Sequence, residues 1–122
     1  MENALIGKTF VVTGATSGIG LATARLLALQ GADVIGVGRS AERCRAAEAQ
    51  LRGLHPQSRA RFCPADLALQ SQVRALREEV NVVLQGWGKT CLDGLVNNAG
   101  TFMYWLSLTP EGFETQWAVN HL

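Results

Sequence analysis

The sequence lacks the features of a secreted, membrane-spanning or polyanion-binding protein. Its 122 residues include three cysteines, an odd number without metal-ligand or redox spacing, so neither disulfides nor a metal site are expected. No apolar run reaches the roughly 20 residues of a membrane span, and the N-terminus lacks the pattern of a secretion signal. Eleven basic and ten acidic residues are dispersed along the chain, which argues against a nucleic-acid partner. A cytoplasmic protein of one domain is therefore expected.

Short apolar runs alternate with stretches of helical periodicity along the chain. Runs typical of buried parallel strands lie at residues 9–13, 33–38, 61–66 and 92–97. Apolar spacing predicts helices at residues 19–29, 41–54, 73–84 and from 110 onward. Pro64 has to end its strand, Asp93 and Gly94 interrupt theirs, and Ser40 is the expected N-cap of the second helix. This order predicts a doubly wound α/β fold, a Rossmann-type parallel sheet with helices on both faces.

A glycine-rich turn separates the first expected strand from the first expected helix. Its glycines follow the spacing G-x-x-x-G-x-G, which differs from the G-x-G-x-x-G of other dinucleotide-binding turns. A pyrophosphate needs backbone N–H donors at a helix N-terminus, and glycines let the backbone come close to it. A turn without a ligand is the alternative. The cofactor-binding residues predicted in this turn are Gly14, Thr16, Ser17, Gly18, Ile19 and Gly20.

A second motif, Asn97-Asn98-Ala99-Gly100, ends the fourth expected strand. On its own it would indicate only a turn. Together with the glycine turn, and in the same order, it resembles the two hallmarks of the short-chain dehydrogenase/reductase family, and the similarity spans essentially the whole chain. The resemblance implies a dinucleotide cofactor, and it assigns cofactor-binding roles to Asn97, Ala99 and Gly100.

Further positions resemble the family more locally. Asp66 and Leu67 follow the third expected strand and match the pair that contacts the adenine in the family. Asn120 matches the catalytic-site asparagine, which in the family helps to position a water in the proton relay; an ordinary polar residue near a helix end is the alternative. The segments at residues 112–114 and 119–122 resemble those of retinol-dehydrogenase-like reductases.

The residue after the second expected strand favours NADP(H) over NAD(H). An acidic side chain at this point would bind the ribose hydroxyls of the adenosine, whereas a basic one would accept a 2′-phosphate. Arg39 stands there, and its guanidinium can stack on the adenine and form charge-assisted hydrogen bonds with the phosphate. A solvated surface arginine is the alternative.

The family's catalytic serine and Tyr-x-x-x-Lys pair have no counterpart in the chain. The single tyrosine, Tyr104, is followed by Leu108 where the lysine would stand. The resemblance therefore implies that residues 1–122 are the dinucleotide-binding half of a domain that is truncated after about four βα units and is inactive alone. The full-length parent would interconvert a small carbonyl and its alcohol. An open sheet edge would favour self-association or a sheet-completing partner.

Two alternative functions stay open. The first is a catalytically inactive dinucleotide-binding or scaffolding module, which is consistent with the missing tyrosine and lysine. The second, another nucleotide or methyl-donor binder on a similar sheet, leaves residues 97–100 unexplained. His55 precedes Pro56 in an expected loop, and it is expected to face solvent rather than to act in catalysis.

Overall fold

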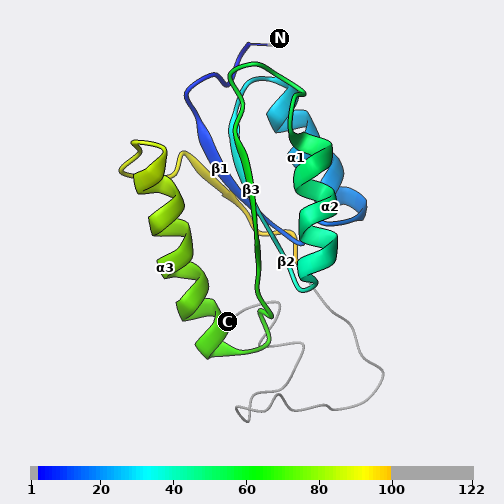
Figure 1. Ribbon diagram of the computed structural model, residues 1–122, viewed down its shortest axis with the longest axis vertical. Helices are drawn as coiled ribbons and strands as arrows, with labels where there is room; N and C mark the ends of the chain where they lie inside the picture. The colour runs from blue at the N-terminus through cyan, green and yellow to red at the C-terminus, as the bar shows by residue number, and fades with distance from the viewer. Residues whose placement is uncertain (1–2, 100–122) are drawn as a thin grey trace.

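Four strands and three helices alternate along residues 3–99, which are the residues that the computed structural model describes (Figure 1). The strands are β1 (Thr9–Thr13), β2 (Asp33–Gly38), β3 (Ala60–Pro64) and β4 (Gly94–Val96). The helices are α1 (Gly18–Leu29), α2 (Ala41–Leu51) and α3 (Gln70–Gly86). The helix expected from residue 110 onward lies outside the described residues.

The strands form one parallel sheet in the order β3-β2-β1-β4. Helices α1 and α2 cover one face of the sheet and α3 covers the other (Figure 1). The predicted doubly wound α/β fold is therefore confirmed. The chain runs outward from β1 to β2 and β3 and then crosses to β4 on the other side of β1. In open α/β sheets such a reversal leaves a crevice at the carboxyl ends of the strands, where ligands bind.

Each face of the sheet has its own apolar core. Neighbouring residues of a strand point to opposite faces, so Val12 and Val34 pack with α1 and α2, whereas Val11 and Ile35 pack with α3. Every residue of β2 is buried, because this strand lies inside the sheet and is covered on both faces. Burial on both faces explains why the strands appear in the sequence as continuous apolar runs.

The structure corrects several boundaries that the sequence predicted; β3, for example, comprises Ala60–Pro64 rather than residues 61–66. Strand β4 comprises Gly94–Val96 rather than residues 92–97. Just before it, the Asp93 carboxylate takes the place of a backbone acceptor for the Thr9 N–H, at 2.7 Å, while the Asp93 N–H donates to the Thr9 carbonyl oxygen at 2.8 Å. Helix α2 ends at Leu51 rather than near residue 54, since Gly53 has a φ of +82°, outside the helical region. Helix α3 begins at Gln70 rather than at residue 73.

The starts of β2 and β3 are joined by a charged contact. The carboxylate of buried Asp33 accepts the backbone N–H of Arg59 at 2.8 Å and pairs with its guanidinium at 2.8 Å. The same guanidinium lies 5.1 Å from the centre of the Trp87 ring, a cation–π arrangement. Arg59 therefore connects both strands to Trp87 at the end of α3.

The outer edge of β3 offers few free hydrogen-bond donors. The N–H of Phe62, in the middle of the strand, donates to Glu48 Oε1 on α2 at 2.8 Å. Pro64 ends the strand as predicted, and proline has no N–H. Side chains that occupy or remove the donors of an edge strand prevent it from pairing with another chain. The sheet is thus closed on its β3 side.

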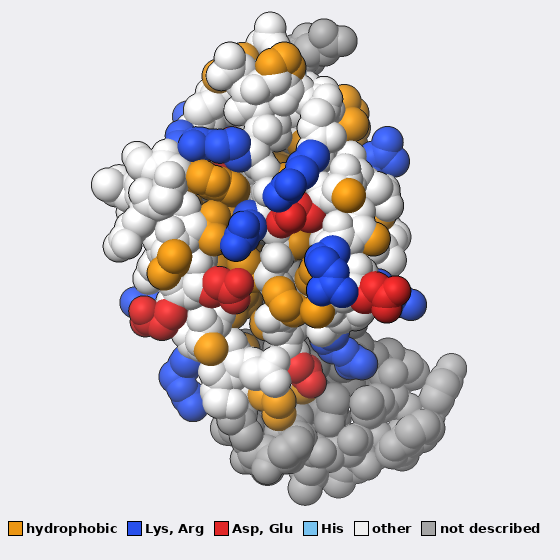
Figure 2. Space-filling model, in the orientation of Figure 1, with side chains coloured by type: hydrophobic (Ala, Val, Ile, Leu, Met, Phe, Trp, Pro, Cys, Tyr) orange, Lys and Arg blue, Asp and Glu red, His pale blue; other side chains and the backbone are white. Residues whose placement is uncertain are grey.

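Basic and acidic side chains are interspersed over the face of the molecule that Figure 2 shows. Among residues 3–99, no helix combines the length and the apolar character that crossing a membrane would require. The cytoplasmic location expected from the sequence stays a prediction.

Thiol labelling at neutral pH should distinguish Cys91 from the other two cysteines. Cys91 is exposed, whereas Cys44 and Cys63 are buried. Burial raises the pKa of both buried thiols from the ordinary value of 9.0, and with a further contribution from Glu79 it raises the pKa of Cys63 to about 12. Because the thiolate is the reactive form, we expect one labelled cysteine in the folded chain by mass spectrometry. All three should react in urea, and rapid labelling of Cys63 in the folded chain would contradict this packing.

Candidate functional site

The glycine turn lies between β1 and α1, at the carboxyl edge of the sheet where the strand order reverses. Gly14 and Gly18 have φ angles of +61° and +57°, in the left-handed region that favours glycine. The N–H of Ala15 donates to the carbonyl oxygen of Val37 at 3.0 Å, so the turn is also bound to the end of β2. Glycine at these two positions therefore allows the chain to leave β1 and enter α1.

Gly20 allows α1 to approach the end of β1. A Cβ atom at this position would overlap the carbonyl oxygen of Gly14 and would lie 2.6 Å from Asn98 Nδ2. Gly20 has no positive φ, so packing rather than backbone conformation requires glycine here. The third glycine of the motif thus sets the distance between helix and strand.

The first turn of α1 is open to an anion. A Cβ atom on Gly18 would meet nothing within 4 Å, and the next residue, Ile19, is 78% exposed. Ser17 at the N-cap position has an extended backbone, and its side chain makes no capping hydrogen bond. The N–H groups of a first helical turn have no partner within the helix. They can therefore bind the oxygens of a pyrophosphate, whose charge the helix dipole also favours.

Asn98 and Ala99 are bound to the end of β1. The backbone N–H of each donates to Thr13 Oγ1 at 3.0 Å, and Asn98 Nδ2 donates to the carbonyl oxygen of Gly14 at 3.3 Å. Asn98 stands inside the predicted 97–100 motif, whereas the sequence did not place Thr13 among the site residues. The Thr13 hydroxyl gave no signal, because threonine is common in strands whatever its contacts.

Arg39 lies at the same edge of the sheet, immediately after β2. Its side chain is exposed, and the neighbouring Ser40 caps α2 as predicted, since Ser40 Oγ accepts the N–H of Arg43 at 3.2 Å. The end of β2 and the start of α2 are therefore well defined on both sides of Arg39.

Asp66 and Leu67 lie just beyond the carboxyl end of β3. Asp66 is half-buried, and its carboxylate accepts the N–H of Ala68 at 3.0 Å, which shapes the turn into α3. Leu67 packs against the core on the α3 face. Both residues thus have structural contacts at the place where the family resemblance expects an adenine.

The described residues of the predicted site all follow the carboxyl ends of strands, so they lie at one end of the sheet. Gly100 and Asn120 lie outside the described residues, so their roles stay predictions. That the other site residues contact a dinucleotide is also still a prediction. Within residues 3–99, no group of three or more histidine, cysteine, aspartate or glutamate side chains could hold a metal ion.

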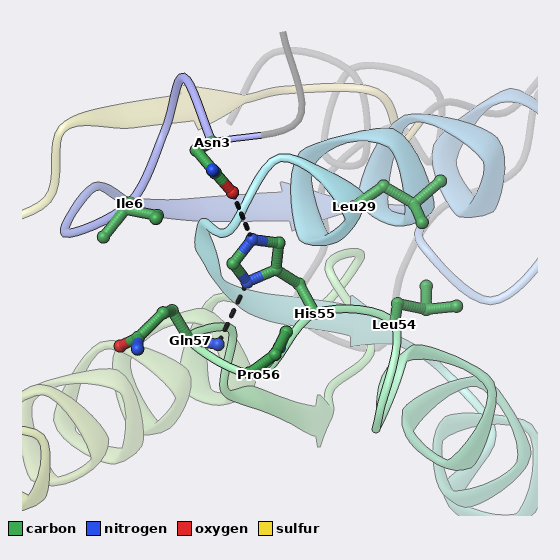
Figure 3. Close-up of a pocket in the computed structure, with 7 residues that line it drawn as sticks. All are labelled: Asn3, Ile6, Leu29, Leu54, His55, Pro56 and Gln57. Atoms are coloured by element: carbon green, nitrogen blue, oxygen red, sulfur yellow. Dashed lines mark hydrogen bonds between the residues drawn. The ribbon is translucent and has the colours of Figure 1, made fainter.

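A hollow of about 660 Å³ lies beside His55 (Figure 3). It lies near the amino ends of the strands, whereas the glycine turn lies at their carboxyl ends. His55 Nδ1 accepts the N–H of Gln57 at 3.0 Å, and Nε2 lies 2.8 Å from Asn3 Oδ1. His55 is half-buried and borders this hollow. Because this segment precedes β3 whereas the glycine turn follows β1, the hollow is separate from the candidate site.

The match to known proteins extends along almost the entire chain. Residues 8–121 match the profile of the family described as short chain dehydrogenase. The chain belongs to this family. The family resemblance that the glycine turn and residues 97–100 indicated is therefore confirmed.

Several short chain dehydrogenases are similar to this one. A short chain dehydrogenase/reductase of Colletotrichum higginsianum is 42% identical over 97% of this chain and 29% of its own length. Human retinol dehydrogenase 13 is 37% identical over 95% of this chain and 34% of its own length. The structure of L-sorbose reductase from Gluconobacter frateurii, complexed with NADPH and L-sorbose, is 32% identical with a TM-score of 0.74, over 97% of this chain and 42% of that chain.

The chain spans less than half the length of these relatives. The resemblance to retinol-dehydrogenase-like reductases stays a prediction. Residues 112–114 and 119–122, on which it rests, lie outside the described residues. A relative with a different name is 42% identical to the chain, against 37% for human retinol dehydrogenase 13.

Replacing Thr13 by valine should destabilise the fold by about 2 kcal/mol, because the N–H groups of Asn98 and Ala99 lose a shared acceptor in a partly buried place. Thr13→Ser keeps the hydroxyl, so its free energy of unfolding should fall clearly less. Urea unfolding followed by circular dichroism measures both. Equal losses for the two variants would contradict the role given to the hydroxyl.

Proposed function

We propose that this short chain dehydrogenase binds NADP(H) and that residues 1–122 are the dinucleotide-binding half of an oxidoreductase that interconverts a carbonyl and an alcohol. The observation that carries the proposal is the N-terminus of α1 at Gly18, which no side chain caps. It lies in a turn where φ angles require glycine at two positions and packing requires it at the third. The NADPH in the L-sorbose reductase structure, a protein 32% identical to this chain, supports the cofactor class.

The residues of the glycine turn fit a pyrophosphate. The backbone of Ser17, Gly18 and Ile19 would provide the N–H donors, and the absence of a side chain at Gly18 leaves space for the phosphate oxygens. Gly14 and Gly20 would keep the helix and the strand close enough to present those donors together. No ionised side chain is needed at this point, because the helix N-terminus itself favours an anion.

Other residues would hold the remaining parts of the cofactor. Asp66 and Leu67 would border the adenine, and Asn97, Ala99 and Gly100 would border the nicotinamide ribose. A bound nicotinamide supplies or accepts the hydride in this chemistry. Asn120 would help to position the water of a proton relay, as the matching asparagine does in the family.

The Arg39→Ala variant should bind NADPH about ten- to a hundredfold more weakly, because charge-assisted hydrogen bonds to the 2′-phosphate are lost. Its affinity for NADH, which has no 2′-phosphate, should change little. Isothermal titration of both dinucleotides measures the effect. Arg52→Ala is the control, since it removes the same charge at the far end of α2. Tighter binding of NADH than of NADPH by the unchanged chain would overturn the NADP(H) assignment.

We further propose that the chain in isolation associates through β4. Among residues 3–99, β4 pairs with β1 only, and Leu95 is 63% exposed. An edge strand with free donors and an exposed apolar side chain favours pairing with another chain. A segment that follows β4 in a longer chain, or a partner, would complete the sheet in the same way.

Size-exclusion chromatography with light scattering should find the chain larger than a monomer. Leu95→Lys should shift it toward the monomer, because a charge on an edge strand opposes pairing. Val82→Lys is the control, since Val82 is similarly exposed, at 66%, but belongs to helix α3 rather than to the edge strand. A stable monomer of the unchanged chain would contradict this proposal without affecting the cofactor assignment.

A further inference from the structure

Gly38 ends β2 and has no room for a side chain. A Cβ atom at this position would overlap the Cγ2 methyl of Thr16, and it would lie 3.2 Å from Thr16 Oγ1 and 3.4 Å from Cys44 Sγ. Gly38 has no positive φ, so its backbone conformation would accept any residue. The requirement for glycine therefore comes from Thr16, a residue of the glycine turn.

The β2 side of this contact is held from several directions. The carbonyl oxygen of Gly38 accepts the N–H of Ala65 at 2.8 Å and the thiol of Cys44 at 3.6 Å. Every residue of β2 is buried, and a packed core resists displacement. The strand end is therefore the fixed partner in the contact with Thr16.

The turn side of the contact is held less firmly. Thr16 is half-buried, and the next residue, Ser17, is exposed and makes no capping hydrogen bond. Before Thr16, the bond from the Ala15 N–H to Val37 ties the turn to β2. A group placed against Thr16 would therefore displace the part of the turn that begins at Thr16 and leads to Gly18, rather than the strand.

We infer that Gly38 and Thr16 are positioning residues, which hold the first turn of α1 at a fixed place relative to Arg39. The inference rests on the proposed binding of NADP(H). The amides after Thr16 would bind the pyrophosphate, and Arg39, next to Gly38, would bind the 2′-phosphate. The contact between Gly38 and Thr16 thus fixes the place of the pyrophosphate donors, which either dinucleotide would use. A side chain at position 38 moves the pyrophosphate donors away from their place.

Gly38→Ala, Thr16→Ser and the double variant test this contact in the full chain. Serine keeps the hydroxyl but lacks Cγ2, the atom that a Cβ at position 38 would overlap. Gly38→Ala should weaken the binding of NADPH and NADH alike by about tenfold or more, because both share the pyrophosphate. The double variant should bind within about threefold of Thr16→Ser alone, since variants of residues in contact are not additive. Recovery of binding in the double variant would assign the loss to the contact with Thr16 Cγ2 rather than to Gly38 alone.

Gly36→Ala is the matched control. Gly36 lies in the same strand, and a Cβ there would overlap the ring of Phe62 in the core rather than the turn. Adding Thr16→Ser to Gly36→Ala should therefore restore neither dinucleotide affinity nor stability.

Urea unfolding without cofactor provides a second measurement. Gly38→Ala should lower the unfolding midpoint, and Thr16→Ser should restore part of that loss. If the unchanged chain binds neither dinucleotide, the proposed function is overturned and the positioning role with it. If the unchanged chain binds, then an unaltered Gly38→Ala variant, a loss confined to NADPH, or a double variant without recovery overturns the inference alone.

Discussion

The close approach of α1 to the end of β1 is the constraint on which the candidate site depends. Because Gly20 carries no side chain, the Gly14 carbonyl lies against the helix and still accepts a hydrogen bond from Asn98 Nδ2. The Thr13 hydroxyl adds two bonds to the same segment. Strand β4 is thereby held to β1 beyond its short ladder. A methyl group at position 20 would push apart the helix, the strand and the segment after β4 at once.

Hydrophobic periodicity was enough to predict the order and type of the described elements, because β1 and β2 are buried between helices on both faces of the sheet and each helix buries one apolar face. It did not predict where β4 begins, since the Asp93 carboxylate bonds to Thr9, far away in the sequence. The glycine turn was recognised because its constraints are local: two positive φ angles and a helix start. The contact of Thr16 with Gly38 could not be recognised, because it joins the glycine turn to the end of β2, which lies far away in the sequence.

The described part of the candidate site is formed largely by backbone groups. Its donors are N–H groups of a turn and a helix start, and the glycines keep side chains away from them. Such a site needs little net charge, which is consistent with a chain whose basic and acidic residues nearly balance. Arg39 is the basic side chain that follows β2, so one residue would carry the discrimination between two cofactors that are otherwise alike.

The two edges of the sheet differ in a way that limits assembly. Glu48 and Pro64 leave the β3 edge with few donors, whereas within residues 3–99 β4 has a neighbour on one side only. A sheet of this kind can be extended in one direction. If two copies paired through their β4 strands, the β4 edge of each copy would be occupied. The outer strands of the combined sheet would then be the two β3 strands, which offer few donors. By this symmetry, association of the chain would stop at a pair and would not continue into a filament.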